Sequence, residues 1–128
     1  MKTLIVSLFV LPSLLAQPAG GGIDDISRAL AQGDVAVLSN YFDIEVELSI
    51  LDEEDTYDKT DATAMVRSFF GDNAPRGFTQ VHQGVSRGSE AEYCIGDLTT
   101  SSGNFRVYIY LANVGNKQVI QELRFDRE

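Results

Sequence analysis

Side chains that commonly perform catalysis or bind metals are scarce in this sequence. His82 is the only histidine and Cys94 the only cysteine. A histidine can act as a general base, but a single one within a strand is more often a hydrogen-bonded structural residue. A metal site needs several converging ligands, and the pattern offers none. No Gly-x-Ser-x-Gly, phosphate-loop or dinucleotide fingerprint occurs. We predict no catalytic residue, metal or cofactor.

Carboxylates are concentrated in one short segment. Residues 52–61 carry six of them, and the formal net charge of the chain is -9. The spacing lacks the glycine and the terminal glutamate of an EF-hand, so a solvated loop is expected in preference to a calcium site. Phosphate backbones and anionic lipids repel so acidic a protein, which argues against nucleic acid or membrane surfaces as partners. The six are Asp52, Glu53, Glu54, Asp55, Asp58 and Asp61.

Residues 104–127 form two aromatic and β-branched runs around a short linker at 113–117, which predicts a β-hairpin. Side chains alternate across a strand, so the first run separates into an aliphatic face and a mixed face. Phe105, Val107, Ile109 and Leu111 lie on the aliphatic face, which Val119, Leu123 and Phe125 continue. Arg106, Tyr108 and Tyr110 lie on the mixed face, which Ile120, Glu122 and Arg124 continue.

The register of the preceding strand follows from the cost of burying a charge. If Thr100 pairs with Phe105, Asp97 stays on the mixed face, whereas a slip of one residue would place it among core aliphatics. The mixed face then has more aromatic surface than a solvated face needs, so we expect a second subunit, a protein partner or a ligand to cover it. The candidate partner face is Tyr93, Ile95, Arg106, Tyr108, Tyr110, Ile120 and Arg124.

Two plainer interpretations of this face remain open. The tyrosines can form the surface of a monomer, with their rings packed and their hydroxyls in water. Arg106 and Arg124 can form a surface charge ladder with Asp97 and Glu122, since cross-strand pairs of opposite charge are favourable. Cys94 cannot form an intramolecular disulfide, because it has no second cysteine to pair with, and its strand pattern predicts that it is buried.

The elements that must position these residues can be read from periodicity and caps. A helix begins at Ile23, Gly33 ends it, and Asp34 caps a short second helix. Residues 43–51 alternate as a strand, with Ile44, Val46, Leu48 and Ile50 inward, and a third helix capped by Thr60 covers 60–70. Further strands are expected at 78–85, 91–99 and 105–112, before the final run. The predicted class is α+β, with order α-α-β-α-β-β-β-β in one domain at 23–128.

The N-terminus resembles an export signal. Lys2 precedes an apolar run of about 12 residues that ends at Ala16, which is too short for a membrane span. We predict a signal peptide at 1–16, a linker at 17–22 and an exported protein, periplasmic or extracellular, with no membrane association after cleavage.

Several segments together resemble a bacterial secreted family described as domain of unknown function 4783, of the nuclear transport factor 2-like (cystatin-like) superfamily. They are SNYF at 39–42, VEL at 46–48, YDK at 57–59, FF at 69–70, HQG at 82–84, YCIGDLTT at 93–100, GNFRVY at 103–108 and IQELR at 120–124. The resemblance implies a curved antiparallel sheet with the N-terminal helices on one face, and an exported protein. It implies no activity.

The fold leaves two functional hypotheses. The first is a non-enzymatic binding or dimerisation domain that uses the mixed face, with a cone between helices and sheet able to hold a small apolar ligand. The second is an enzyme of the ketosteroid isomerase or dehydratase kind, because the same fold hosts such enzymes. In that case Tyr41, Tyr57 or Tyr93 would donate to an oxyanion and Asp43 or Asp97 would serve as an acid. The candidate pocket residues are Tyr41, Tyr57 and His82.

Overall fold

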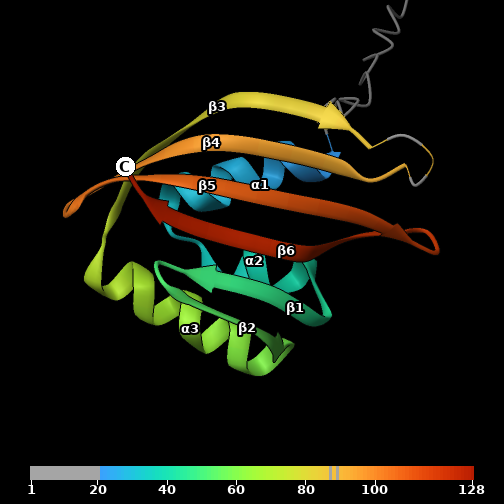
Figure 1. The fold of residues 1–128 in the computed structure, drawn as a ribbon, viewed down its shortest axis with the longest axis horizontal. Coiled ribbons are helices and arrows are strands. Elements are labelled where there is room, and N and C mark those ends of the chain that lie inside the picture. The colour runs from blue at the N-terminus through green and yellow to red at the C-terminus, as the bar shows by residue number, and fades with distance from the viewer. Residues whose placement is uncertain (1–20, 87, 89) are drawn as a thin grey trace, which may run out of the picture.

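The computed structural model describes residues 21–128 except Arg87 and Ser89 (Figure 1). One curved sheet has all three helices packed on one of its faces, so the predicted α+β class is confirmed. The sheet order is β2-β1-β6-β5-β4-β3. In chain order the elements are α1 (Gly21–Gln32), α2 (Val35–Tyr41), β1 (Phe42–Ile50), β2 (Glu53–Asp58), α3 (Lys59–Asp72), β3 (Pro75–Val85), β4 (Glu92–Thr100), β5 (Gly103–Val114) and β6 (Lys117–Arg127).

The helix boundaries follow local capping chemistry. Gly33 has a φ of +68°, a conformation that glycine adopts without strain, and the Asp34 side chain accepts a hydrogen bond from the Val37 amide, as predicted. α1 begins at Gly21, two residues before the expected start. α3 is capped by Asp58, which accepts from the Asp61 amide at 2.8 Å. Thr60 therefore lies inside the helix, and its prediction as the cap was wrong.

The acidic segment expected to be a loop forms a strand instead. β2 pairs antiparallel with β1 from Glu45↔Asp58 to Ile50↔Glu53 and makes one edge of the sheet. β1 pairs on its other side with β6 in parallel, so the expected all-antiparallel sheet contains one parallel pair. Because that pair joins the first strand to the last, residues far apart in the sequence become neighbours.

The predicted division into two faces is confirmed between β4 and β5. Thr100 pairs with Gly103 and Leu98 with Phe105, which differs from the expected register by two residues. A shift of two leaves every side chain on its expected face, because side chains alternate with a period of two. Leu98 and Val107 are accordingly fully buried.

Two isoleucines break the alternation, and both predictions for them were wrong. The register shifts between Tyr110 and Leu111, so that Ile120 pairs with Leu111 and is completely buried in the core. Ile120 therefore does not belong to the partner face. A similar irregularity in β1 leaves Ile44 82% exposed where an inward side chain was expected. One extra residue in a strand reverses the direction of every side chain before it.

The space between helices and sheet is filled by side chains. Aliphatic residues from all three helices meet the inner face of β1, β4, β5 and β6, and the rings of Phe69, Phe105 and Phe125 pack with centroids 4.6 to 5.0 Å apart. Ser49 and Thr100 are the only polar residues in the buried class within the described part of the chain. These side chains form the hydrophobic core in the space where a cone for an apolar ligand was expected, and the ligand itself stays a prediction.

Candidate functional site

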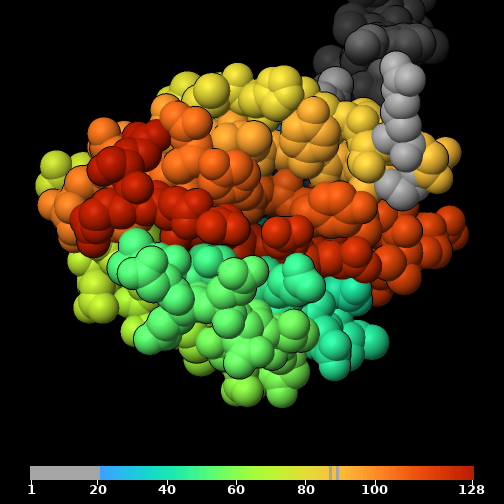
Figure 2. All heavy atoms as spheres, in the orientation of Figure 1, coloured from blue at the N-terminus to red at the C-terminus, as the bar shows by residue number. Residues whose placement is uncertain are grey.

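The face of the sheet turned away from the helices carries the predicted tyrosines, and we call it the outer face. Figure 2 shows it with β5 and β6 across its centre, β3 and β4 on one side and β1 and β2 on the other. Tyr93 pairs with Tyr110 and Ile95 with Tyr108 across β4 and β5, as the predicted alternation requires. The outer face thus keeps six of the seven predicted partner-face residues: Tyr93, Ile95, Arg106, Tyr108, Tyr110 and Arg124.

A small hollow lies among these tyrosines. It has a volume of about 170 Å³ and is bordered by Tyr93, Ile95, Tyr108, Tyr110 and Glu122, with Cys94 and Ile109 also contributing to its lining. We call this depression the tyrosine hollow, and the Tyr108 side chain at it is 37% exposed. Aromatic rings with a carboxylate beside them favour a group that is partly apolar and positively charged.

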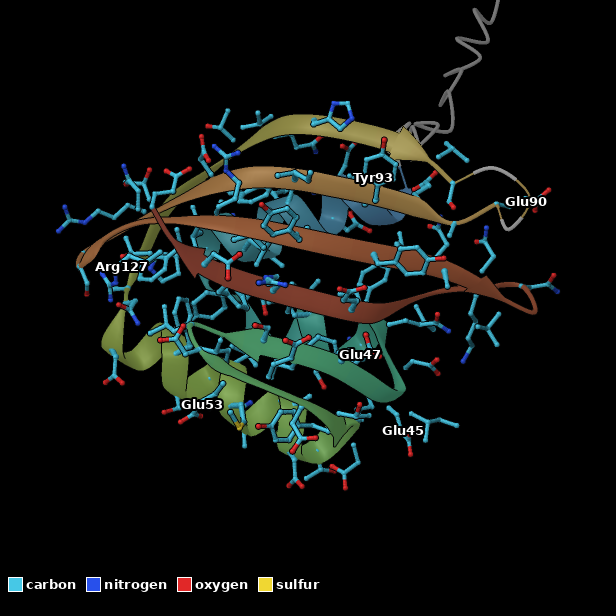
Figure 3. The ribbon with its side chains drawn as sticks, in the orientation of Figure 1. Glu45, Glu47, Glu53, Glu90, Tyr93 and Arg127 are labelled. Carbon is cyan, nitrogen blue, oxygen red and sulfur yellow. The ribbon has the colours of Figure 1, made fainter. Side chains whose placement is uncertain are left out.

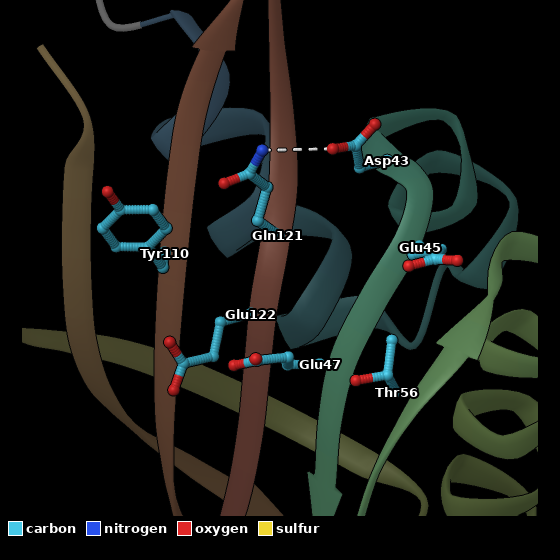
Figure 4. Close-up of a pocket in the computed structure, with 7 residues that line it drawn as sticks. All are labelled: Asp43, Glu45, Glu47, Thr56, Tyr110, Gln121 and Glu122. Atoms are coloured by element: carbon cyan, nitrogen blue, oxygen red, sulfur yellow. Dashed lines mark hydrogen bonds between the residues drawn. The ribbon is translucent and has the colours of Figure 1, made fainter. Parts of the chain in front are cut away.

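A second hollow adjoins the first, and we call it the acidic groove. It has a volume of about 420 Å³ and lies over β1, β2, β5 and β6 (Figure 4). Gln121, the extra residue of β6, donates a hydrogen bond to Asp43 at 3.1 Å. The two hollows share Tyr110 and Glu122 in their linings, so they are neighbours on the outer face. The groove is lined by Asp43, Glu45, Glu47, Thr56, Tyr110, Gln121 and Glu122.

Two carboxylates of the groove stand directly opposite each other. Glu47 and Glu122 are cross-strand neighbours in the parallel β1–β6 pair, and Figure 4 shows their side chains side by side. Neither takes part in an ion pair among the residues that the structure describes. Like charges facing each other across a sheet destabilise the pairing. The folded protein therefore retains an uncompensated repulsion at the centre of the groove.

The arginines of the outer face are already engaged. Arg106 contacts Asp97 and Glu128, each at 2.8 Å, and Arg124 contacts Asp126 of its own strand at 2.9 Å. The hydrogen bonds that the two guanidinium groups donate to these carboxylates raise the pKa of both arginines. The predicted ladder pair of Arg106 with Asp97 is confirmed, whereas Arg124 pairs with Asp126 in place of Glu122.

The three candidate pocket residues do not come together. Tyr57 lies on β2 and His82 on β3, which are the opposite edges of the sheet. His82 Nε2 is 3.2 Å from the Tyr93 hydroxyl. The Tyr41 hydroxyl donates to Asp25 at 2.7 Å, and burial together with that carboxylate raises its pKa to about 12. The prediction of one pocket formed by these residues was therefore wrong.

The residues named in the enzyme hypothesis are not gathered at one place either. Its donors and acids are dispersed: Asp97 is held by Arg106 and Asp43 lines the groove on the outer face. The core contains no carboxylate or histidine in the buried class among the described residues. Within the same residues, no group of three or more His, Cys, Asp or Glu side chains is arranged to hold a metal ion.

The acidic groove was missed because its parts come from distant segments. The alternation of residues 43–51 does place Glu45 and Glu47 outward, and that of the final run places Glu122 on the mixed face. What the sequence pattern does not provide is the parallel pairing of β1 with β6, which brings the two sets together. The same face of the ribbon carries Glu45 and Glu47 on β1 and Tyr93 on β4 (Figure 3).

The predicted N-terminal organisation is described only in part by the structure. The signal peptide at 1–16 and the first residues of the predicted linker fall outside the described residues. Of the linker, Gly21 and Gly22 belong to α1, and the Gly22 amide donates to the Gln118 side chain. No helix in the described part is long and apolar enough to cross a membrane.

The fold and the chain both have relatives among solved structures. A protein from Bacteroides ovatus is 35% identical, with a TM-score of 0.77 over 81% of this chain and 93% of that one. One from Bacteroides uniformis is 31% identical, with a TM-score of 0.77 over 82% and 95%. Both are described as DUF4783 family proteins. A de novo designed protein with a curved β-sheet, 13% identical, matches with a TM-score of 0.67 over 81% of this chain and 94% of its own, which shows the fold alone.

The family comparison agrees with these structures. No curated protein matches the chain. The model of the family described as "Domain of unknown function (DUF4783)" matches residues 23–126, and the predicted nuclear transport factor 2-like fold is confirmed by the structural neighbours. The chain belongs to the DUF4783 family.

Proposed function

We propose that this protein is an exported binding domain whose outer face holds a positively charged segment of another protein. The observation that carries the proposal is the facing pair of Glu47 and Glu122, which no described cation neutralises. A lysine or arginine side chain placed between them would relieve their repulsion. Because binding removes the repulsion between the two carboxylates, that repulsion in the free protein favours the complex.

The tyrosine hollow suits the same kind of partner. Lysine and arginine have an apolar stem and a charged end, and they pack the stem on apolar surface while the charge reaches a polar group. A cation within about 6 Å of a tyrosine ring centre is also attracted by the ring. Tyr110 and Glu122 belong to both hollows, so an extended basic segment can contact rings and carboxylates in succession.

The charge of the whole chain supports this choice of partner. A formal net charge of -9 attracts cations and repels anions at long range, and such steering raises association rates at low salt. The same charge disfavours a second copy of the chain on the outer face, because the groove of each copy would meet an acidic surface. Export is part of the proposal, and it rests on the apolar N-terminal run at 4–15.

The experiment measures binding of an octalysine peptide by isothermal titration calorimetry, with octaglutamate as the negative probe. The test variant is E47Q/E122Q. The matched control is D52N/E53Q, which also removes two negative charges but at another place. Glu53 lies at the far end of the β1–β2 pair from Glu45 (Figure 3). We expect the test variant to weaken binding about tenfold, equivalent to about 1.4 kcal/mol, and the control about twofold or less.

Two further measurements distinguish a specific binding site from general attraction between an acidic protein and a basic peptide. Tyr108→Ser leaves every charge in place, so it weakens octalysine binding only if the rings contribute. E47Q/E122Q should raise the urea midpoint of unfolding, because it removes the repulsion within the groove. Equal weakening of binding by the test and control variants would contradict the proposal. So would a Tyr108→Ser variant that binds as tightly as the unsubstituted protein.

A further inference from the structure

We infer that the free edge of β3 pairs with β3 of a second copy of this chain, forming a dimer with one continuous sheet. β3 is the last strand of the sheet order and has a neighbour on one side only within the described residues. It is eleven residues long. An edge of this length presents unpaired amide and carbonyl groups that can form hydrogen bonds with another strand.

The two edges of the sheet differ in a way that selects β3. β2 carries four carboxylates in six residues, and charged side chains on an edge prevent pairing with another copy. β3 contains no aspartate or glutamate; its ionisable residues are Arg76 and His82. It also exposes Val81 and Val85, at 53% and 65%. One edge is thus protected by repulsion, and the other has no acidic side chain and exposes two valines.

A second copy is the occupant because β3 has no acidic side chain and exposes two valines, and both features favour a strand that pairs with its own copy. In a two-fold dimer each strand meets itself running the opposite way, so a carboxylate on β3 would enter the contact twice and add to the repulsion between the copies. With none present, two strongly acidic chains can meet here with the least repulsion. A basic partner, in contrast, gains nothing from an edge that has no carboxylates.

The geometry of such a dimer leaves the outer face free. Antiparallel pairing at an edge has its two-fold axis perpendicular to the sheet, so both outer faces lie on the same side. The bulge between Gln80 and His82 bends the strand, which restricts pairing to a short stretch and makes the dimer weak. Two acidic grooves on one side would bind a long basic segment with gain from the second contact.

The test is sedimentation velocity of the exported protein over a range of concentrations at low and high salt. We expect a reversible dimer that strengthens with salt, because salt screens the repulsion between two negatively charged copies. The test variant is V81K/V85K, which places two cations on β3 of each copy, so that like charges meet in the contact. The matched control is I44K/V114K, which replaces two exposed apolar residues away from β3 with the same charges.

The variant should raise the dimer dissociation constant about tenfold or more, equivalent to about 1.4 kcal/mol, while the control leaves it unchanged or lowers it. Amide hydrogen exchange in residues 78–85 should slow as protein concentration rises. A protein that stays monomeric at every concentration and salt overturns the inference, as does a V81K/V85K dimer of unchanged affinity. Salt weakens octalysine binding but strengthens the dimer, and each is measured in its own experiment. Either proposal can therefore fail while the other stands.

Discussion

Gly96→Ala should destabilise the protein strongly, although it adds only one methyl group. Gly96 faces the core on β4, and a Cβ built there would lie 2.7 Å from Phe78 Cε1 and 2.7 Å from the Thr79 carbonyl oxygen. The Phe78 ring can rotate, but the Thr79 oxygen belongs to the backbone of the paired strand. β3 would therefore have to move away from β4, across the ladder that joins them.

The magnitude follows from two opposing effects. Overpacking a core costs about 1 to 3 kcal/mol, and replacing a glycine in a strand returns about 0.5 to 1 kcal/mol of backbone entropy. Because the obstructing Thr79 oxygen belongs to the backbone, the upper end of the overpacking cost applies, and we expect a net loss of about 2 kcal/mol in the free energy of unfolding. For a domain of this size that corresponds to a fall of about 10 °C in Tm.

Urea unfolding followed by far-UV circular dichroism measures this loss, and a neighbouring glycine provides the control. Gly77 lies on the paired strand β3, and a Cβ there meets nothing within 4 Å. Gly77→Ala should therefore be neutral or slightly stabilising. The reasoning is refuted if Gly96→Ala unfolds at the same urea concentration as the unsubstituted protein, or if the two alanine variants are equally stable with unchanged m-values.

Two further predictions concern a cap and a buried thiol. Asp34→Ala should lower the free energy of unfolding by about 1 kcal/mol, because the Val37 amide loses its acceptor, whereas Asp34→Asn should retain most of it; equal urea midpoints for the two variants would exclude the capping role. Burial, with a smaller effect from Asp24, raises the pKa of Cys94 from 9.0 to about 11, so the stability that the neutral thiol provides is complete below pH 9 and is lost as the pH rises from 9 to 11. The stability advantage over Cys94→Ala should shrink between pH 8 and pH 10.5, and an unchanged difference would show that the thiol is not the group responsible.

Periodicity was sufficient for the parts of the fold in which one face is buried. The meander of β3 to β6 and the helices α1 and α2 were predicted because aliphatic residues recur at the period of each element. The register between β4 and β5 was displaced by two residues, yet the faces were right, since only parity decides which side a residue occupies.

The errors share a physical cause, which is that pairing can override local pattern. β2 has no apolar alternation and is rich in residues that disfavour strands, so only its hydrogen bonds to β1 make it one. Ile120 and Ile44 were assigned to the wrong faces because register irregularities interrupt the alternation of β6 and β1. Such irregularities leave little trace in residue type.

Of the two hollows of the candidate site, the sequence predicted the residues of one and missed the other. The tyrosine hollow lies within one antiparallel meander, so local alternation was enough to find its residues. The acidic groove depends on β1 lying beside β6, a contact between segments about 75 residues apart in the chain. No spacing rule within a single sequence specifies which distant strand becomes a neighbour.

The β1–β6 pair also determines the order in which the molecule can assemble during synthesis. β3 to β6 form successive hairpins and can associate as each strand leaves the ribosome. β1 and β2 have no route into the sheet until β6 has emerged, because β6 alone connects them to the other strands. The first two strands must therefore wait for β6, and a chain delayed before that point would keep the apolar side chains of β1 accessible to chaperones.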